Sequence, residues 1–373
     1  MTATHPQTRY PSLLLAALLL AAVFSLGLAS CGEEGGSAPT SDCESGVSRA
    51  GVLADQAAKA TSRLNNSVRR AGELRASLVD LATETTENQL AIAREDLRAA
   101  RYAFAQLGPY ALLLDEAQVT LPSIAPFPVD TGLVIGYARV DSFEFSASHE
   151  FDRGYGAIEF LLYGPDSSRT LALLAAEPPR VLLALAYANH AAQALSAVET
   201  RWLEDGSEAF VEADGTAAGT GFSRLVNSLS KHYEDTRRDR LGTPFGVTLG
   251  FPSPRVLEAP YSGRSLGLLE ANLAGSQSAY GALTDPVTLA AYTAGLANAE
   301  GADLAADVVA QYDAALAALA ALGLPLAQAI EDERDAVQTA YNAISRQVVN
   351  LKTDLPSVTC VAITYVDNPS DSD

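Results

Sequence analysis

Apolar and small residues recur at alternating steps of four and three along three segments of the chain. The first segment has nine such positions: Leu53, Ala57, Ala60, Leu64, Ser67, Ala71, Leu74, Leu78 and Leu81. The second has seven: Leu90, Ala93, Leu97, Ala100, Phe104, Leu107 and Ala111. The third has six and is predicted to stop at Pro356: Val337, Tyr341, Ile344, Val348, Leu351 and Leu355. This spacing indicates long helices packed nearly parallel to their neighbours.

Further helices and two long loop regions are predicted between these segments. The helices are expected over 179–204, 220–240, 264–280, 286–298 and 302–322. The loop regions cover 116–152 and 241–263 and are rich in proline and glycine. Loops of this length inside a helical protein are usually functional.

The predicted fold class is all-α, with two helical bundles and long functional loops between helices. A Gly- and Ala-rich stretch over 205–221 divides the helical material into halves of comparable size. We therefore expect an N-terminal bundle over 45–205 and a C-terminal bundle over 206–373. The small residues in the seams allow the helices of each bundle to approach closely.

The first residues of the chain are typical of an export signal. An apolar stretch too short to span a bilayer runs from Leu13 to Leu28 and leads into Leu28-Ala29-Ser30-Cys31. That quartet resembles the lipobox of bacterial lipoprotein precursors, which implies a signal peptide over 1–30 and an acylated Cys31. Residues 31–44 would then be the lipidated cysteine and a flexible tether. An ordinary secretory signal remains the alternative, and Gly32 after Cys31 favours the periplasmic face of the outer membrane.

Charge and cysteine content narrow the partners and the compartment. The chain has 45 acidic and 25 basic residues, for a net charge of −20. Such an excess repels phosphate backbones and anionic lipid surfaces, so no nucleic acid partner is expected and the membrane link would be the lipid anchor alone. Cys43 and Cys360 form an even pair in an oxidising compartment and are expected to be disulfide-bonded, with two free thiols as the alternative.

One carboxylate stands out in an otherwise apolar helix. The segment from Arg153 to Gly164 reads RGYGAIEFLLYG, with Tyr155 one turn before Glu159 on the same face. Burying Glu159 without a partner is costly, so it should meet an arginine, a histidine, several hydrogen-bond donors or a metal ion. A salt bridge that only pins the helix is the structural alternative.

The same segment resembles the Gly-x-His-x-x-Glu motif of the imelysin-like family. A second family signature is similar to Leu241-Gly242-Thr243-Pro244-Phe245-Gly246, followed by Glu258, Tyr261-Ser262-Gly263, Ser265 and Asn272-Leu273, and the end of the chain resembles the family's acidic tail. The resemblance implies an exported, often lipid-anchored protein of two helical bundles, associated with iron or haem. The family was first described as a class of peptidases.

The chain departs from the family motif at one position. It keeps Gly154 and Glu159 but has Gly156 where the motif has histidine. Imidazole is a common metal ligand and general base, so its loss weakens both a metal site and a hydrolytic role. His149 is a candidate substitute from the preceding loop, although a solvated loop histidine is the simpler interpretation. Of the remaining histidines, His190 is expected in the core and His232 at the surface.

Two nucleophile-like strings lack the context that their chemistry needs. Gly263-Arg264-Ser265-Leu266-Gly267 matches a nucleophile elbow, but a proline-rich loop precedes it instead of a strand. Ser228-Leu229-Ser230-Lys231 lies inside an amphipathic helix pattern. With no His-Glu-x-x-His pattern in the sequence, no catalytic residue is assigned.

The sequence therefore predicts a lipoprotein that binds iron, haem or another metal-linked ligand between the bundles. The site would lie where the Glu159 helix meets the loop ending at Ser265, with Glu159 and Glu258 as oxygen donors for a hard cation. Tyr155, Ser262 and Ser265 would add polar contacts, and Arg153 or Arg264 a counter-charge. A peptidase-like hydrolase and a non-binding structural or interaction lipoprotein are the alternatives.

Overall fold

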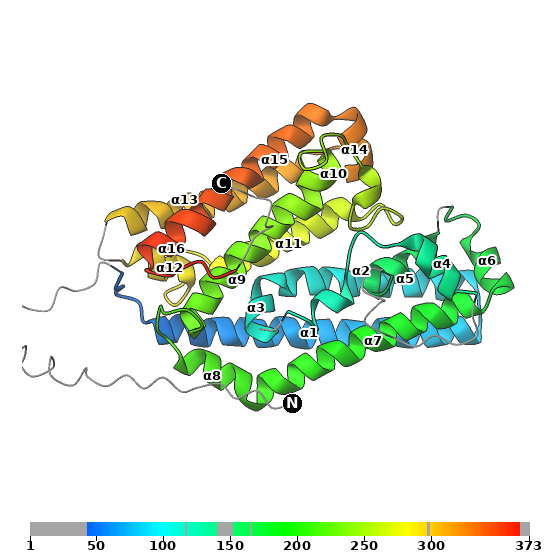
Figure 1. Ribbon diagram of the computed structural model, residues 1–373, viewed down its shortest axis with the longest axis horizontal. Coiled ribbons are helices and arrows are strands. Elements are labelled where there is room, and N and C mark those ends of the chain that lie inside the picture. The colour runs from blue at the N-terminus through cyan, green and yellow to red at the C-terminus, as the bar shows by residue number, and fades with distance from the viewer. Residues whose placement is uncertain (1–42, 116–117, 140–151, 165, 297–298, 366–373) are drawn as a thin grey trace, which may run out of the picture. The chain divides into compact units, whose positions relative to one another are not determined.

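The computed structural model describes residues 43–115, 118–139, 152–164, 166–296 and 299–365 (Figure 1). They belong to one compact unit, Asp42–Asp373. All regular structure in these ranges is helical, apart from one isolated antiparallel bridge between Ser45 and Leu296. The all-α prediction is therefore confirmed. The predicted signal peptide and Cys31 lie outside the described residues.

The first bundle consists of four helices that pack on one another. These are α1 (Arg49–Thr83), α2 (Glu87–Leu107), α5 (Gly154–Tyr163) and α7 (Pro179–Arg201). Ser48 caps α1 by accepting a hydrogen bond from the Gly51 N–H, and Thr86 caps α2 in the same way. All nine seam positions predicted in α1 are buried, so the four-and-three spacing identified its packed face correctly.

The second bundle consists of α9 (Gly221–Asp235), α11 (Ser265–Tyr280), α13 (Ala299–Ala320) and α15 (Arg334–Val349). In Figure 1 these helices, coloured from light green to orange, lie above the first bundle. The predicted ends of α11 agree with the structure to within one residue. The predicted helix over 286–298 is shorter and is α12 (Leu289–Ala294).

Three helices continue through π-helical turns, which the sequence did not predict. These turns are Trp202–Gly206 after α7, η5 (Thr236–Gly242) after α9, and η7 (Asn350–Asp354) after α15. The prediction that Pro356 stops the last helix is wrong, because α16 (Leu355–Val358) carries this proline in its first turn. The proline directly follows the π-helical turn η7, where the hydrogen-bond register differs from that of a regular α-helix.

Both predicted loop regions contain short helical turns. The first holds η2 (Pro122–Ile124) and α4 (Thr131–Tyr137), and the second holds α10 (Thr243–Phe245) and η6 (Pro254–Val256). The remaining short elements are η1 (Gly108–Tyr110), α3 (Ala111–Leu114), α6 (Thr170–Ala176), α8 (Ser207–Glu212) and α14 (Leu326–Asp332). The apolar piece Gly132–Gly136 lies in α4, where the Asp130 side chain accepts hydrogen bonds from the first N–H groups.

The helical stretch Pro179–Glu212 is long and apolar enough to cross a membrane by length and composition alone. It packs against α1 and α5, however, and Tyr187, Ala191, Leu195 and Val198 are buried. These contacts are those of a core helix of the first bundle.

The two bundles meet along α2 and α11, and where η1 and α3 pack against α9. The disulfide Cys43–Cys360, with a Cα–Cα distance of 5.8 Å, joins the residues before α1 to those after α16 and confirms the predicted pairing. The Tyr292 hydroxyl in α12 donates to the Cys43 carbonyl at 2.9 Å. The predicted boundary between 205 and 206 stays a prediction, and α8, just beyond it, contacts α1.

Candidate functional site

The helix that carries Glu159 is buried along almost its whole length. Gly154 begins α5 with φ +75°, and a Cβ atom there would lie 2.3 Å from the Ile124 carbonyl oxygen. Glycine is therefore required for both conformation and space. The close approach brings the 122–129 segment directly against α5 and fixes the depth at which Glu159 enters the core.

Both carboxylate oxygens of Glu159 are engaged. Oε2 accepts a hydrogen bond from Arg101 Nη1 at 2.7 Å, and Oε1 accepts from the Ser262 N–H at 2.7 Å and the Ser262 hydroxyl at 2.5 Å. The side chains of Arg101 and Glu159 are only 6% and 1% exposed. Arg101 and Glu159 neutralise each other's charge, and a buried ion requires such a partner.

Arg101 links Glu159 to the loop before α11. Its Nη2 donates to the Glu258 carbonyl oxygen. Arg101, Glu159, Ser262 and the Glu258 carbonyl together form a unit that we call the Glu159 cluster. It joins α2, α5 and the loop in front of α11, so this buried charge pair sets how the second bundle meets the first.

The Glu258 side chain points to a different partner. Its Oε2 accepts from Arg240 Nε at 2.9 Å, and the Arg240 guanidinium lies 5.0 Å from the centre of the Phe127 ring. The Ser265 hydroxyl accepts a hydrogen bond from the Ala259 N–H at 3.3 Å. The structure thus brings Glu159, Glu258, Ser262 and Ser265 to the same region, but each carboxylate is bound to an arginine.

This geometry does not fit a cation held directly by Glu159 and Glu258. A metal ion at Glu159 would have to displace Arg101 or stand beside its positive charge. Within the described ranges, no group of three or more His, Cys, Asp or Glu side chains is placed to hold a metal ion. His149 lies outside those ranges. Metal binding by this pair of carboxylates therefore finds no support in the arrangement of the two side chains.

The position of the missing motif histidine is filled by the neighbouring loop. A Cβ atom on Gly156 would lie 2.5 Å from Val129 Cγ2. A side chain as large as histidine fits only if the loop moves away. Gly156 and Val129 are therefore complementary, and the glycine is part of a packed contact between α5 and the 122–129 segment.

Tyr155 and Arg153 flank this contact on two sides. The Tyr155 ring packs edge-on against Phe104 at 5.9 Å, and its buried hydroxyl has no hydrogen-bond partner among the described residues. Burial raises the pKa of Tyr155 above its usual range, so the hydroxyl stays protonated. Arg153 instead lines a cavity, and its buried Nε also lacks a hydrogen-bond partner there.

That cavity lies between the two bundles and has a volume of about 590 Å³. Its apolar wall comes from α2, η1, α3 and the loop after them: Phe104, Leu107, Ala111, Leu112, Val119, Leu121, Pro122, Ala125, Pro126 and Phe127. Its polar groups include Arg153, Ser228, Lys231, His232, Asp235, Asp239, Arg240 and Asn272. Phe104 and Ala111, two members of the predicted α2 seam, are only partly buried because they face this space.

His232 is the residue whose place the sequence most misjudged. It was expected at the surface, but it lines the cavity, and its ring would be 2.2 Å from a Cβ atom on Gly108. Its Nε2 lies 3.4 Å from the Asn272 carbonyl oxygen. Burial, reinforced by the charge of Arg240, lowers the pKa of His232 to about 3, so the imidazole is neutral. His190, expected in the core, is only partly buried, and its ring pairs with the Ser123 hydroxyl at 3.1 Å.

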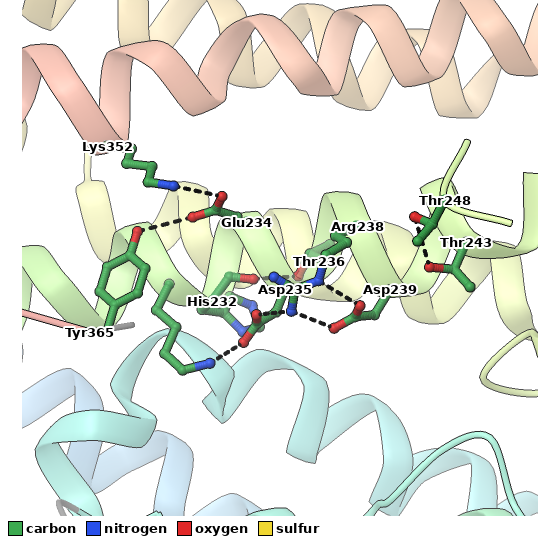
Figure 2. A network of polar contacts seen from close by, with 11 residues as sticks. His232, Glu234, Asp235, Thr236, Arg238, Asp239, Thr243, Thr248, Lys352 and Tyr365 are labelled. Atoms are coloured by element: carbon green, nitrogen blue, oxygen red, sulfur yellow. Dashed lines mark hydrogen bonds and ion pairs between the residues drawn. The ribbon is translucent and has the colours of Figure 1, made fainter. Parts of the chain in front are cut away.

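The acidic groups on the α9 wall of the cavity are already paired. Asp235 accepts from Lys231 Nζ at 2.6 Å and Arg238 Nη2 at 2.7 Å, and Arg238 Nε donates to Asp239 at 2.8 Å. Figure 2 shows this chain of contacts, with Glu234 turned to the opposite side toward Lys352 and Tyr365. Arg153 and Asn272 also line the cavity. Asn272 Oδ1 and Arg153 Nε have no hydrogen-bond partner in the part of the chain described, but both atoms are buried away from the open space.

Sequence reasoning missed Arg101, Arg240, His232 and Asn272 as members of the site. Arg101 gave a signal, since it is in step with Leu97 and Phe104 on the apolar face of α2. His232 follows Leu225 and Leu229 at helical spacing. In both cases a polar residue in phase with an apolar stripe faces the interior: Arg101 is buried, and His232 is partly buried at the cavity wall.

Comparisons with known proteins place this chain in a family. A family profile described as Imelysin matches residues 60–351, which is more than half of the chain. Comparison with curated proteins gave no match. An iron-regulated protein A precursor from Parabacteroides distasonis ATCC 8503 superposes with a TM-score of 0.72 at 18% identity, covering 87% of this chain and 97% of that one.

A second solved structure gives the same result. It is an imelysin-like protein from Psychrobacter arcticum 273-4, with a TM-score of 0.70 at 16% identity over 86% of this chain and 99% of that one. At such identities the likeness concerns the fold. Together with the profile match, it leads to one statement: this chain belongs to the imelysin family.

Proposed function

We propose that this protein is an exported, lipid-anchored imelysin-family protein that binds a small, partly apolar organic ligand in the cavity between its two bundles. The ligand class includes metal-linked molecules such as haem and ferric chelates, bound as whole molecules. The observation that carries the proposal is the cavity itself, with its apolar wall and the few polar side chains that line it.

The size and lining of the cavity support this ligand class. Its volume of about 590 Å³ is within the usual range for small-molecule sites, which are mostly apolar with a few convergent polar groups. Arg153 brings a charged guanidinium group to the lining and Asn272 an amide. A ligand with an acidic group would gain a charge-assisted hydrogen bond from the Arg153 guanidinium.

Metal-linked ligands come into the proposal from the relatives. One neighbour of similar fold is described as an iron-regulated protein. A bare ion is disfavoured here because Glu159 is held by Arg101 and Ser262, and Glu258 is held by Arg240. An organic chelate needs no carboxylate ligands from the protein, so it suits the cavity better than a free cation does.

Export and anchoring rest on the N-terminal sequence and on cysteine usage. The lipobox-like quartet ending in Cys31 supports acylation, and the Cys43–Cys360 disulfide suits an oxidising compartment. If Cys31 carries the lipid, Cys31→Ser should move the protein from the membrane fraction to the soluble fraction. Continued membrane fractionation of that variant would contradict the anchor.

Calorimetry on the mature protein tests the cavity proposal with haem, ferric citrate, citrate and free ferric or divalent ions as probes. We expect haem or ferric citrate to bind and the free ions not to bind. Ala111→Phe, which fills the cavity, should abolish binding, and Arg153→Gln should weaken it about tenfold through loss of a charged hydrogen bond. The matched control is Ala317→Phe, on the exposed face of α13, which should bind like the parent protein.

Two outcomes would overturn the proposal. Binding of a free ion that Glu159→Gln removes would restore the direct metal site. Failure of both haem and ferric citrate to bind, or binding unchanged in Ala111→Phe, would show that the cavity does not hold a ligand of this class.

A further inference from the structure

Four arginines surround one small depression beside the Glu159 cluster. Arg94, Arg98 and Arg101 follow one another on α2 at steps of four and three, and therefore share one helix face. Arg264 reaches the same depression from the residue before α11. This arginine depression contrasts with the chain as a whole, which has a net charge of −20.

Positive charge at the depression is only partly compensated. Arg94 donates a hydrogen bond to the Leu162 carbonyl oxygen at 2.9 Å, and its guanidinium lies 4.5 Å from the centre of the Tyr163 ring. Neither partner carries a negative charge that would neutralise Arg94. Arg101 is paired with Glu159. Arg98 is paired with Glu95, whose side chain is 60% exposed. Exposed pairs of this kind hold their partners weakly.

Arg264 is the most available of the four guanidinium groups. It is exposed, and no hydrogen bond or ion pair is found for it among the described residues. Arg264 also lies close to the Arg98–Glu95 pair. The pKa of the Glu95 carboxyl is lowered by the hydrogen bond from Arg98 first, and then by the charges of Arg98, Arg264 and Arg70. Two flexible cations therefore stand at the rim of the depression.

The depression itself is small. Arg101 forms part of its inner wall, and the side chain is only 6% exposed. The volume of the depression is about 10 Å³, close to what a single water-sized group needs. One oxygen atom of an anion fits there, while the remaining oxygens stay outside.

We propose that the arginine depression binds a small oxyanion, a carboxylate or phosphate group, with one oxygen in the depression and the others against Arg98 and Arg264. Planar guanidinium groups suit this chemistry because their N–H donors match two oxygens of a carboxylate or phosphate at once. The group comes from a free metabolite or from a lipid headgroup, which present the same oxygens.

This site is independent of the proposed ligand cavity. No residue lines both spaces, since the cavity is formed by Leu107, Phe127, His232 and their neighbours, and the depression by the four arginines, Tyr102 and Tyr163. Loss of one binding activity therefore leaves the other intact, and each can be tested by itself.

Titration calorimetry of the full mature protein with inorganic phosphate and with citrate, at low ionic strength, tests the proposal. We expect binding that weakens as salt is added. Arg264→Gln should weaken it about fivefold and Arg98→Gln/Arg264→Gln further, because charged hydrogen bonds are lost. The matched control is Arg255→Gln, an exposed arginine outside the depression with the same change in charge, which should bind like the parent protein.

A vesicle arm identifies the source of the group. Co-sedimentation with vesicles of anionic phospholipid that Arg264→Gln reduces and Arg255→Gln does not, without binding of free phosphate or citrate, supports a headgroup. Binding of the free anions supports a metabolite. If neither probe binds, the proposal is wrong. If Arg264→Gln and Arg255→Gln reduce binding equally, the effect is one of net charge, and the proposal is wrong as well.

Discussion

The Glu159 cluster and the cavity lie close together but are built in opposite ways. In the cluster, both oxygens of a buried carboxylate have partners, and Arg101 and Ser262 close around them. In the cavity, polar side chains such as Arg153 and Asn272 stand beside a largely apolar wall and open volume. The carboxylate of the family motif is therefore engaged within the protein, and the cavity for which we propose ligand binding lies next to it.

The difference is visible in how the two regions are packed. At Gly156 the chain has no room for a side chain, whereas Ala111 faces open volume. The cavity, with a volume of about 590 Å³, leaves the side chains of Phe104 and Ala111 only partly buried. Four changes test whether the cluster is closed and the cavity open.

The largest effect is expected from breaking the buried pair. Glu159→Ala leaves Arg101 charged and buried, so the free energy of unfolding should fall by about 3–5 kcal/mol. Arg101→Met combined with Glu159→Leu should recover a large part of that loss. Chemical denaturation measures both variants. The control is Glu95→Ala in the exposed Arg98–Glu95 pair, which should lower the free energy of unfolding by less than about 1 kcal/mol. An equal loss of stability in Glu159→Ala and Glu95→Ala would contradict the closed cluster.

Restoring the motif histidine should also destabilise the protein. Gly156→His forces the new side chain against Val129, at a cost of about 3 kcal/mol in the free energy of unfolding. Val129→Ala in the same chain should return part of it. Gly136→His, at an exposed position with no heavy atom within 4 Å of a new Cβ, is the control. If Gly156→His is tolerated as well as the control, the loop does not fill the site.

Lowering the pH should weaken the protein through His232. The folded state holds its pKa near 3, while the unfolded imidazole titrates near 6.5. Below the unfolded value the unfolded state binds a proton that the folded state does not, so stability is complete above about pH 6.5 and falls as the pH drops. Between about pH 7 and pH 5 this amounts to about 2 kcal/mol.

His232→Gln removes that contribution, so its stability should depend less on pH than that of the parent chain. Thermal or urea unfolding at several pH values compares the two. Parallel stability curves for both proteins would show that His232 is not held neutral by the cavity wall.

The smallest effect is expected where the volume is open. Ala111→Leu places added atoms in the cavity and should change the free energy of unfolding by less than about 1 kcal/mol, whereas Ala157→Leu, in the fully buried face of α5, should cost about 1–3 kcal/mol. Urea denaturation measures the contrast. Similar losses at the two alanines would mean that the cavity is not open as described.

Much of the fold follows from the sequence because helix packing repeats over short distances. The seam of α1 was predicted from spacing alone, and Glu159 was expected to need a partner because its helix is apolar nearly all round. The partner itself was not predictable, since Arg101 is 58 residues away along the chain. The pairing depends on how α2 and α5 pack, which spacing within one helix does not encode.

The spacing of apolar residues did not predict the cavity or the π-helical turns. The cavity exists because Phe104 and Ala111 continue an apolar seam without meeting an opposing surface. A sequence pattern shows that a side chain is apolar, but it does not show whether a side chain from another helix packs against it. In η5, the register of hydrogen bonds changes within a stretch whose composition, TRRDRLG, reads as an ordinary helix end.

The disulfide between Cys43 and Cys360 also has a mechanical meaning. It joins two positions 317 residues apart in sequence, so tension applied between the segment before Cys43 and the segment after Cys360 passes through one covalent bond. The helices between them carry none of that load. A protein pulled by its two ends would therefore keep both bundles folded under force, and in the reduced protein the same pull would act directly on α1 and α16.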